Sequence, residues 1–301
     1  MTRVAFIGLG AMGGGMAVNQ AKAGREVRAF DLSAAALERA EAAGCRRAGS
    51  AAEALDGAEA VITMLPAGPH VRNVYAEEVL AHAPADAVLI DCSTIDVGSA
   101  RAVGAQMAGA GRTFADAPVS GGVAAADAGQ LAFMVGCEEG AFERVRSVLE
   151  PMAKAVIHAG EAGAGQAAKI CNNMVLGISM LGVCEGFALA EKLGLDPQKF
   201  YDIASVSSGQ CWSLTSYSPW PGVGPVTASD RNYEGGFLTS LMLKDLKLAQ
   251  GAAAEAGAST PLGAQAEAIY TLMSNLGLGG KDFSIALQML RGNLDPAAKP
   301  A

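Results

Sequence analysis

The stretch RVAFIGLGAMGGGMAVNQAKA, residues 3–23, decides the fold of this chain. Its first seven residues are mostly apolar and predict a buried strand, and residues 12–23 have the pattern of a helix. The glycine-rich turn GLGAMG lies between them. A second apolar run, EVRAF at residues 26–30, predicts another strand directly after the helix. A strand, a helix and a second strand in so short a span are typical of a parallel βαβ unit.

The same alternation continues through the first half of the chain. Helices are predicted at residues 34–43 and 142–152, and further strands at 60–65, 87–91, 113–119, 130–136 and 155–160. Short strands separated by helical segments of about ten residues indicate a doubly wound parallel sheet. The expected fold class is therefore α/β, with an N-terminal Rossmann-type domain.

Helical patterns dominate the second half. A long helix is predicted over residues 166–193, and it ends at Gly194 with Pro197 shortly after. More helices are predicted at 198–205, 237–256, 262–275 and 284–290, with an irregular segment rich in glycine, proline and aromatic residues at 212–236. We expect a Rossmann-type domain at 1–163, an interdomain helix at 164–194 and an all-α domain at 195–301.

Composition excludes several classes of protein. With 22 Lys and Arg against 30 Asp and Glu, the net charge is −8, which argues against nucleic acid and membrane surfaces as partners. Six cysteines without C-x-x-C spacing and three histidines predict neither a zinc site nor a disulfide framework. They fit a reducing compartment, and we expect the cytoplasm. The apolar run at 174–184 is about half the roughly 20 residues of a membrane span, which favours a core helix.

The turn at residues 8–13 matches G-x-G-x-x-G in the context that gives this motif its meaning. It follows a predicted strand and opens a helix, and an acidic residue ends the second strand about 20 residues further on. The first glycine permits a tight turn, the second lets a pyrophosphate approach the backbone, and the third lets the helix pack on the strand. The predicted phosphate-binding residues are Gly8, Leu9, Gly10, Ala11, Met12 and Gly13.

The acidic residue is Asp31. A carboxylate there accepts hydrogen bonds from both adenosine ribose hydroxyls and repels a 2′-phosphate, and the next residues are Leu32 and Ser33 rather than arginine. The sequence therefore predicts NAD and not NADP as the cofactor. As an alternative, Asp31 caps the following helix, a role that Ser33 fills equally well.

Three loops add candidate ligand contacts. MLPAG, with Leu65 and Pro66, and DCSTID, with Ser93 and Thr94, leave the carboxyl ends of strands, where doubly wound sheets bind ligands. DAPVSGG contains Ser120, Gly121 and Gly122, whose hydroxyl and consecutive backbone N–H groups suit a carboxylate. Each of the first two loops is equally readable as an ordinary turn, and the S-G-G motif taken alone favours an ordinary flexible turn.

The segment GAGQAAKICNN, residues 163–173, places polar side chains at the start of a very apolar helix. Lys169 and Asn173 are four residues apart and share a helix face, whereas Asn172 points about 100° away and has a structural role. Partial removal of an ammonium from water lowers its pKa towards the range of an acid/base catalyst. A lysine whose head group reaches the solvent is the alternative interpretation.

Six motifs together resemble the β-hydroxyacid dehydrogenase family over essentially the whole chain: GLGAMGGGMAVN, TMLP, DCSTID, DAPVSGG, GAGQAAKICNN and LKDLKLA occur in its order and approximate spacing. The segment from Cys211 to Phe237 resembles the family member that oxidises 3-hydroxyisobutyrate to methylmalonate semialdehyde in valine catabolism. The portion PWPGVGPVTASDR departs from the family pattern, and we expect it to shape the substrate pocket.

The resemblance implies NAD-dependent oxidation of a small 3-hydroxy acid by a homodimer or homotetramer that the helical domain builds. Lys169 matches the catalytic lysine and Asn173 its partner, and Ser120, Gly121 and Gly122 match the carboxylate-binding turn. Lys244 and Asp245 match residues near the nicotinamide, and Leu65, Pro66 and Thr94 match cofactor contacts. Lys244, Trp212 and Phe237 are further candidate substrate contacts.

Two alternatives stay open. Tartronate semialdehyde reductase and other short-chain 3-hydroxy acid dehydrogenases of the family share these motifs and differ in the shape of the pocket. A non-catalytic dinucleotide-binding protein is the alternative from another class, and Lys169 argues against it. No metal is expected, because a protonated lysine can stabilise the developing oxyanion.

Overall fold

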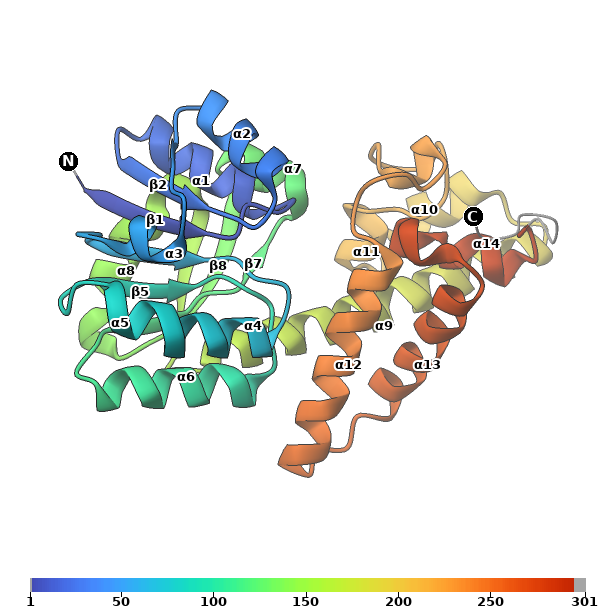
Figure 1. Cartoon of the computed structure of the whole chain (residues 1–301). Helices are drawn as coiled ribbons and strands as arrows, with labels where there is room; N and C mark the ends of the chain where they lie inside the picture. Colours follow the sequence, from blue (N-terminus) through green and yellow to red (C-terminus); the bar gives the residue numbers. More distant parts are fainter. Residues whose placement is uncertain (1, 295–301) are drawn as a thin grey trace. The chain divides into compact units, whose positions relative to one another are not determined.

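The computed structural model describes residues 2–294. The first predicted domain starts at residue 1 and the last ends at residue 301, so both outer ends lie outside the described residues. The chain forms two compact units, Met1–Lys169 and Ile170–Ala301. The first unit is built on a nine-stranded sheet and the second is helical (Figure 1).

The sheet of the first unit has the predicted doubly wound core. β1 (Arg3–Ile7) lies between β2 (Glu26–Phe30) and β4 (Ala60–Thr63), and all its pairings are parallel. The order β3-β2-β1-β4-β5-β6 includes β3 (Arg46–Arg47), β5 (Val88–Asp91) and β6 (Phe114–Asp116). The chain therefore leaves β1 towards β2 and returns on the other side at β4, and open α/β sheets bind ligands at such a reversal of strand order.

The prediction of a wholly parallel sheet is wrong at one edge. β8 (Leu131–Gly136) pairs antiparallel with β6 and with β7 (Val119–Ser120), and β9 (Ala153–Gly160) is parallel to β8. Residues 121–130 connect β7 to β8 and include the short helix α7 (Gly122–Ala128). Because a parallel crossover needs a dozen residues or more, so short a connection returns the chain antiparallel. Pro118 separates β6 from β7, since proline has no N–H group for a ladder.

The carboxyl ends of five strands lie in register. Ile7 pairs with Phe30 and with Thr63, and the pairing continues from Thr63 to Asp91 and from Asp91 to Asp116. The loops that follow these strands therefore start along one edge of the sheet. These loops hold Asp31, the glycine-rich turn, Leu65, Ser93 and the segment before Ser120.

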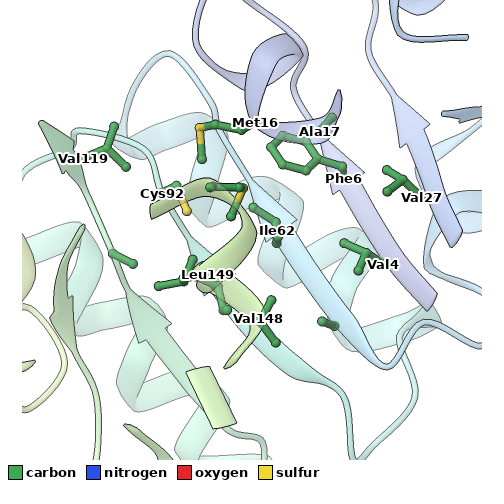
Figure 2. Close-up of a cluster of buried hydrophobic side chains, with 14 of the residues drawn as sticks. Val4, Phe6, Met16, Ala17, Val27, Ile62, Cys92, Val119, Val148 and Leu149 are labelled. Atoms are coloured by element: carbon green, nitrogen blue, oxygen red, sulfur yellow. The ribbon is translucent and has the colours of Figure 1, made fainter. Parts of the chain in front are cut away.

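Helices cover both faces of the sheet. One face packs against α1 (Gly13–Lys22), α2 (Ala34–Ala42) and α8 (Phe142–Leu149). Figure 2 shows this core, where Phe6 and Ile62 from the strands meet Met16 from α1 and Leu149 from α8. The opposite face packs against α3 (Ala51–Leu55), α6 (Val97–Gly109) and a π-helical turn at Val74–Val79. Two covered faces explain why the central strands are continuously apolar instead of alternating.

Helices α1 and α7 approach each other closely. A Cβ at Gly15 on α1 would lie 2.3 Å from the carboxylate of Asp127 and 3.0 Å from its backbone nitrogen. The buried Asn19, one turn further along α1, donates hydrogen bonds to the carbonyls of Ala126 and Asp127. The last turn of α7 is thus fixed to α1.

The first unit also contains α4 (Gly68–Asn73) and α5 (Leu80–His82), and α9 (Ala164–Lys192) runs from it into the second unit. There it is followed by α10 (Pro197–Ala204), α11 (Trp212–Thr215), α12 (Thr239–Ala256), α13 (Pro261–Asn275) and α14 (Ala286–Arg291). α12 and α13 lie side by side (Figure 1) and share a core with α9 that contains Phe187, Met242 and Tyr270.

Two details of the helical part differ from the sequence-based expectation. The last predicted helix begins as a 3-10 turn, Phe283–Ile285, and the segment at 212–236 contains α11 and a 3-10 turn at Ala228–Arg231. The apolar run at 174–184 belongs to the 29-residue helix α9. By length and composition α9 could cross a membrane, although the apolar run alone could not, and core helices of soluble proteins meet the same criterion.

Candidate active site

The glycines of the turn at residues 8–13 serve different purposes. Gly8 has φ +98°, and a Cβ on it would lie 2.2 Å from the carbonyl oxygen of Met64. A Cβ on Gly13 would lie 2.0 Å from the carbonyl oxygen of Gly8. A Cβ on the exposed Gly10 would meet no atom within 4 Å. The fold therefore requires Gly8 and Gly13, whereas Gly10 leaves open space over the backbone.

That open space fits a dinucleotide phosphate. No side chain caps the start of α1, and the first turn of this helix carries no acidic residue. Backbone N–H groups at such a helix start attract anions, and the helix dipole has the matching sign. The residues present therefore fit a pyrophosphate at Gly10, Ala11 and Met12.

Asp31 follows β2 at the same edge of the sheet. Its carboxylate accepts a hydrogen bond of 2.6 Å from the backbone N–H of Leu9 and one of 2.7 Å from that of Ser33. Ser33 is the N-cap of α2, because its hydroxyl accepts from the N–H of Ala36. The alternative in which Asp31 caps this helix is therefore wrong. Each carboxylate oxygen still has acceptor capacity for a ribose hydroxyl.

The two loops after β4 and β5 are joined through Ser93. Its hydroxyl accepts from the N–H of Leu65 at 2.8 Å and donates to the buried carboxylate of Asp91 at 2.5 Å. Asp91 also accepts from the hydroxyl of Thr63 at 2.7 Å. Thr94, the predicted cofactor contact, is half-buried and directly follows Ser93. The loops at 64–66 and 92–95 thus form one hydrogen-bonded group at the ligand edge of the sheet.

The start of α9 is anchored to the sheet by Asp116. This carboxylate at the end of β6 accepts hydrogen bonds from the N–H groups of Gly163, at 2.6 Å, and of Gln166, at 2.8 Å. Burial raises the pKa of Asp116 to about 6, and the two backbone N–H donors partly oppose this rise. The carboxylate is therefore mainly ionised at neutral pH, in the form that accepts both hydrogen bonds.

Lys169 and Asn173 lie on one face of α9, and both are buried, with 6% and 2% of their surface exposed. The Nδ2 of Asn173 donates to the carboxylate of Asp245 on α12, and its Oδ1 accepts from Asn172. These two hydrogen bonds fix the orientation of the Asn173 amide. Lys244, beside Asp245, is half-buried. The structure brings Asp245 to Asn173, a pairing that the sequence motif did not indicate.

The turn after Ser120 has a backbone conformation that favours glycine. Ser120 is the last residue of β7, and Gly121 and Gly122 follow it with φ values of +138° and +71°. A Cβ on Gly121 would lie 2.6 Å from Cβ of Ala125. Positive φ at consecutive residues suits glycine and directs successive N–H groups to a common point. The turn begins α7, the helix that is fixed to α1.

The two predicted aromatic contacts belong to the second unit. Trp212 is 52% exposed and stacks on Tyr217, with ring centroids 5.0 Å apart. Phe237 packs edge-to-face on Phe283. The buried Asp282 connects the two, because it accepts hydrogen bonds from the Tyr217 hydroxyl and the Phe237 N–H, both at 2.8 Å. Burial raises the pKa of Asp282, and its hydrogen bonds oppose this rise.

Sequence reasoning assigned no role to Asp116, Gln166 or Asp282. A signal existed for two of them. Asp116 interrupts the apolar strand pattern FADAPV, and Gln166 is one helical turn before Lys169 on an otherwise apolar helix face. Asp282 carries no comparable local signal.

Two protein-family models match most of the chain. The model for the NAD-binding domain of 6-phosphogluconate dehydrogenase matches residues 3–160. The model described as NAD-binding of NADP-dependent 3-hydroxyisobutyrate dehydrogenase matches residues 163–290. Fold and site define an NAD-binding oxidoreductase with a Rossmann-type domain and a helical domain, as predicted.

Individual relatives narrow the class. The chain is 48% identical to the 3-hydroxyisobutyrate dehydrogenase of Pseudomonas aeruginosa, over 97% of this chain and 99% of the relative. It is 44% identical to an NAD-dependent L-serine dehydrogenase of the same organism, over 96% and 98%. A solved structure of Mycobacterium tuberculosis 3-hydroxyisobutyrate dehydrogenase with L-serine has a TM-score of 0.94 and 47% identity, and covers 97% of this chain and 99% of that one. The chain belongs to the 3-hydroxyisobutyrate dehydrogenase family, which confirms the resemblance seen in the sequence.

The different surroundings of Gly10 and Gly13 generate a prediction. Gly10→Ala has space in the fold, so we expect an unfolding free energy within about 1 kcal/mol of wild type and an affinity for NADH at least ~10-fold weaker. Gly13→Ala meets a backbone carbonyl, so we expect it to cost about 1–3 kcal/mol of stability. Denaturant titration and NADH fluorescence measure the two quantities. Normal NADH affinity in Gly10→Ala would contradict the assignment of this space to the phosphates.

Proposed function

We propose that this chain oxidises 3-hydroxyisobutyrate to methylmalonate semialdehyde with NAD, and that Lys169 is the acid/base. The observation that carries the proposal is the burial of Lys169 on α9, one turn before an Asn173 amide whose orientation Asp245 fixes. A lysine whose head group reaches the solvent would not be 94% covered. The names of the relatives support the substrate.

The roles of the residues follow from their chemistry. The nicotinamide, when bound, accepts a hydride from the carbinol carbon of the substrate. Ser120 and the N–H groups of Gly121 and Gly122 hold the substrate carboxylate. Lys169 as a neutral amine accepts the hydroxyl proton, and as an ammonium it returns this proton in the reverse direction.

Supporting residues hold this chemistry in place. Asn173 hydrogen-bonds the reacting oxygen, with Asp245 fixing its amide. The family motif implies that Lys244 contacts the nicotinamide end of the cofactor, and we propose that Trp212 and Phe237 supply apolar contacts to the substrate. Leu65, Pro66 and Thr94 contact the cofactor, as the family motifs imply.

L-serine is a second candidate substrate, because one relative is named for it and the structure of another contains it. Both acids carry a carboxylate and a 3-hydroxyl group, so the same residues serve either one. A panel of 3-hydroxyisobutyrate, L-serine, 3-hydroxypropionate and glycerate, followed by NADH absorbance, ranks them by kcat/KM. The glycerate arm tests for a tartronate semialdehyde reductase.

Lys169→Ala should lower kcat at least ~100-fold, since a positioned acid/base is worth about 10²–10⁴-fold. NADH affinity, measured by fluorescence, should stay within about threefold of wild type because the phosphate-binding turn is unaltered. Lys192→Ala, at the exposed last turn of the same helix, is the control and should be fully active. Near-normal turnover by Lys169→Ala would refute the mechanism. Tight NADH binding without turnover of any hydroxy acid by wild type would favour the non-catalytic alternative.

The environment of Asp31 predicts the preferred coenzyme. Its carboxylate lies beside the glycine-rich turn, where it accepts from the Leu9 N–H, and the neighbouring Leu32 is 95% exposed and uncharged. We expect kcat/KM for NAD to exceed that for NADP by at least ~100-fold, because a 2′-phosphate would meet a negative charge. Asp31→Asn retains an acceptor for the Leu9 N–H. It should narrow the ratio by raising kcat/KM for NADP. A wild-type preference for NADP would show that the assignment is wrong.

The second unit supports the expected homo-oligomer. Among residues 2–294, the large apolar side chains that are exposed belong to this unit, apart from Leu32, Val123 and Ile157, and Val175 and Leu189 on α9 are each 61% exposed. We propose that side chains of this set form an interface, and that the partner is a second copy of the chain. Sedimentation at about 10 µM should show a dimer or tetramer for wild type and a smaller species for Val175→Asp/Leu189→Asp, with Leu32→Asp as the control. A monomeric wild type would exclude the interface.

We also propose a reducing compartment, the cytoplasm. All six cysteines are free thiols in the structure, and Cys45, Cys92, Cys137 and Cys184 are buried. Cell fractionation that places the protein outside the soluble cytoplasmic fraction would contradict this location.

A further inference from the structure

Gln166 joins the start of α9 to the loop that follows β5. Its side chain is completely buried. Its Nε2 donates a 2.7 Å hydrogen bond to the carbonyl of Ser93, and its Oε1 accepts a 3.1 Å hydrogen bond from the N–H of Ile95. The amide thus bonds to the backbone on both sides of Thr94. We call these two hydrogen bonds the Gln166 bridge.

The bridge extends a longer chain of hydrogen bonds. The Ser93 hydroxyl bonds to the N–H of Leu65 and to Asp91, so the loop after β4 is tied to the loop after β5. Gln166 continues this connection to α9. Residues of both loops are proposed cofactor contacts, and α9 carries the proposed acid/base.

The position of Gln166 itself is fixed independently of its side chain. Its backbone N–H is held by Asp116, as is the N–H of Gly163. Since the helix start is anchored there, the side-chain amide is not needed to begin the helix. Its two hydrogen bonds therefore act on the loop around Thr94.

Gln166 and Lys169 are three residues apart and lie on one face of α9. We propose that Gln166 is a positioning residue, which fixes the loop around Thr94, and with it the cofactor, relative to Lys169. This inference rests on the proposed function. A misplacement of reacting groups by about 1 Å can cost ~100-fold in rate. We therefore expect loss of the Gln166 bridge to lower kcat more than it weakens cofactor binding.

Gln166→Glu tests the bridge by pH. A protonated carboxyl group can donate to the Ser93 carbonyl and accept from the Ile95 N–H, whereas an ionised one cannot donate. The charged groups near this position are Asp91, Asp116, Lys169 and, beside Gly163, Arg101. We expect kcat of Gln166→Glu to approach that of wild type at low pH. As the introduced carboxyl group ionises, its kcat should fall at least ~10-fold relative to wild type, while KM for NAD changes less than about threefold.

Gln20→Glu is the matched control. Gln20 is an equally buried glutamine of the first unit, and it bonds to the carbonyl of Val148 and to Arg25. Gln20→Glu places a carboxyl group in the same unit away from the loop around Thr94, so its kcat should follow the wild-type pH profile. The additional fall of kcat with pH should occur in Gln166→Glu alone.

Hydrogen exchange gives a readout that does not depend on turnover. Gln166→Leu removes the bridge at every pH, so the Ile95 amide should exchange at least ~10-fold faster than in wild type, and kcat should be low throughout. The bridge is overturned if the Ile95 amide keeps its protection, or if Gln166→Glu follows the wild-type pH profile while Lys169→Ala is inactive. If wild type oxidises no hydroxy acid, the proposed function fails instead, and exchange at Ile95 alone then decides whether the bridge exists.

Discussion

The rest of the site depends on two hydrogen bonds that the Asp116 carboxylate accepts from backbone N–H groups. They join the end of a central strand to the start of the helix that carries Lys169. Burying a carboxylate is costly, as the pKa of about 6 indicates, and backbone donors offset part of that cost. The surrounding chain gives it space by omitting side chains: a Cβ on Gly136 would lie 2.4 Å from the carboxylate, and one on Gly165 would lie 2.7 Å from the Asp116 carbonyl. Close packing against Asp116 thus explains Gly165, the second glycine of the GAG motif.

Local patterns predicted most of the fold. Apolar periodicity predicted the strand at Glu26–Phe30 and the helices α1 and α9, and glycine and proline marked where elements end. Strand direction at the edge of the sheet was missed, because it depends on the length of the connection after Ser120 and not on the strand sequence. The π-helical turn at Val74–Val79 and the two-residue strand β3 also have no sequence signature.

The candidate site likewise contains some residues that local sequence predicts and others that depend on distant partners. Gly8, Gly13 and Asp31 could be assigned from sequence, since each acts through a turn or strand end that the motif itself defines. The partners of Asn173 and Gln166 could not, because Asp245 and Ser93 are both more than 70 residues away along the chain. The burial of Lys169 likewise cannot be predicted from the residues next to it in the sequence. Without it, an amine beside an apolar run is equally compatible with a solvent-exposed role.

The close approach of α1 and α7 at Gly15 has a consequence for redesign of specificity. α1, which follows the glycine-rich turn at residues 8–13, and α7, which begins at Gly122, meet backbone to backbone, and Asn19 joins them. A change that moves one helix must move the other. Grafting a new loop at residues 120–122 from a distant homologue therefore calls for transplanting α1 and α7 together, as one block.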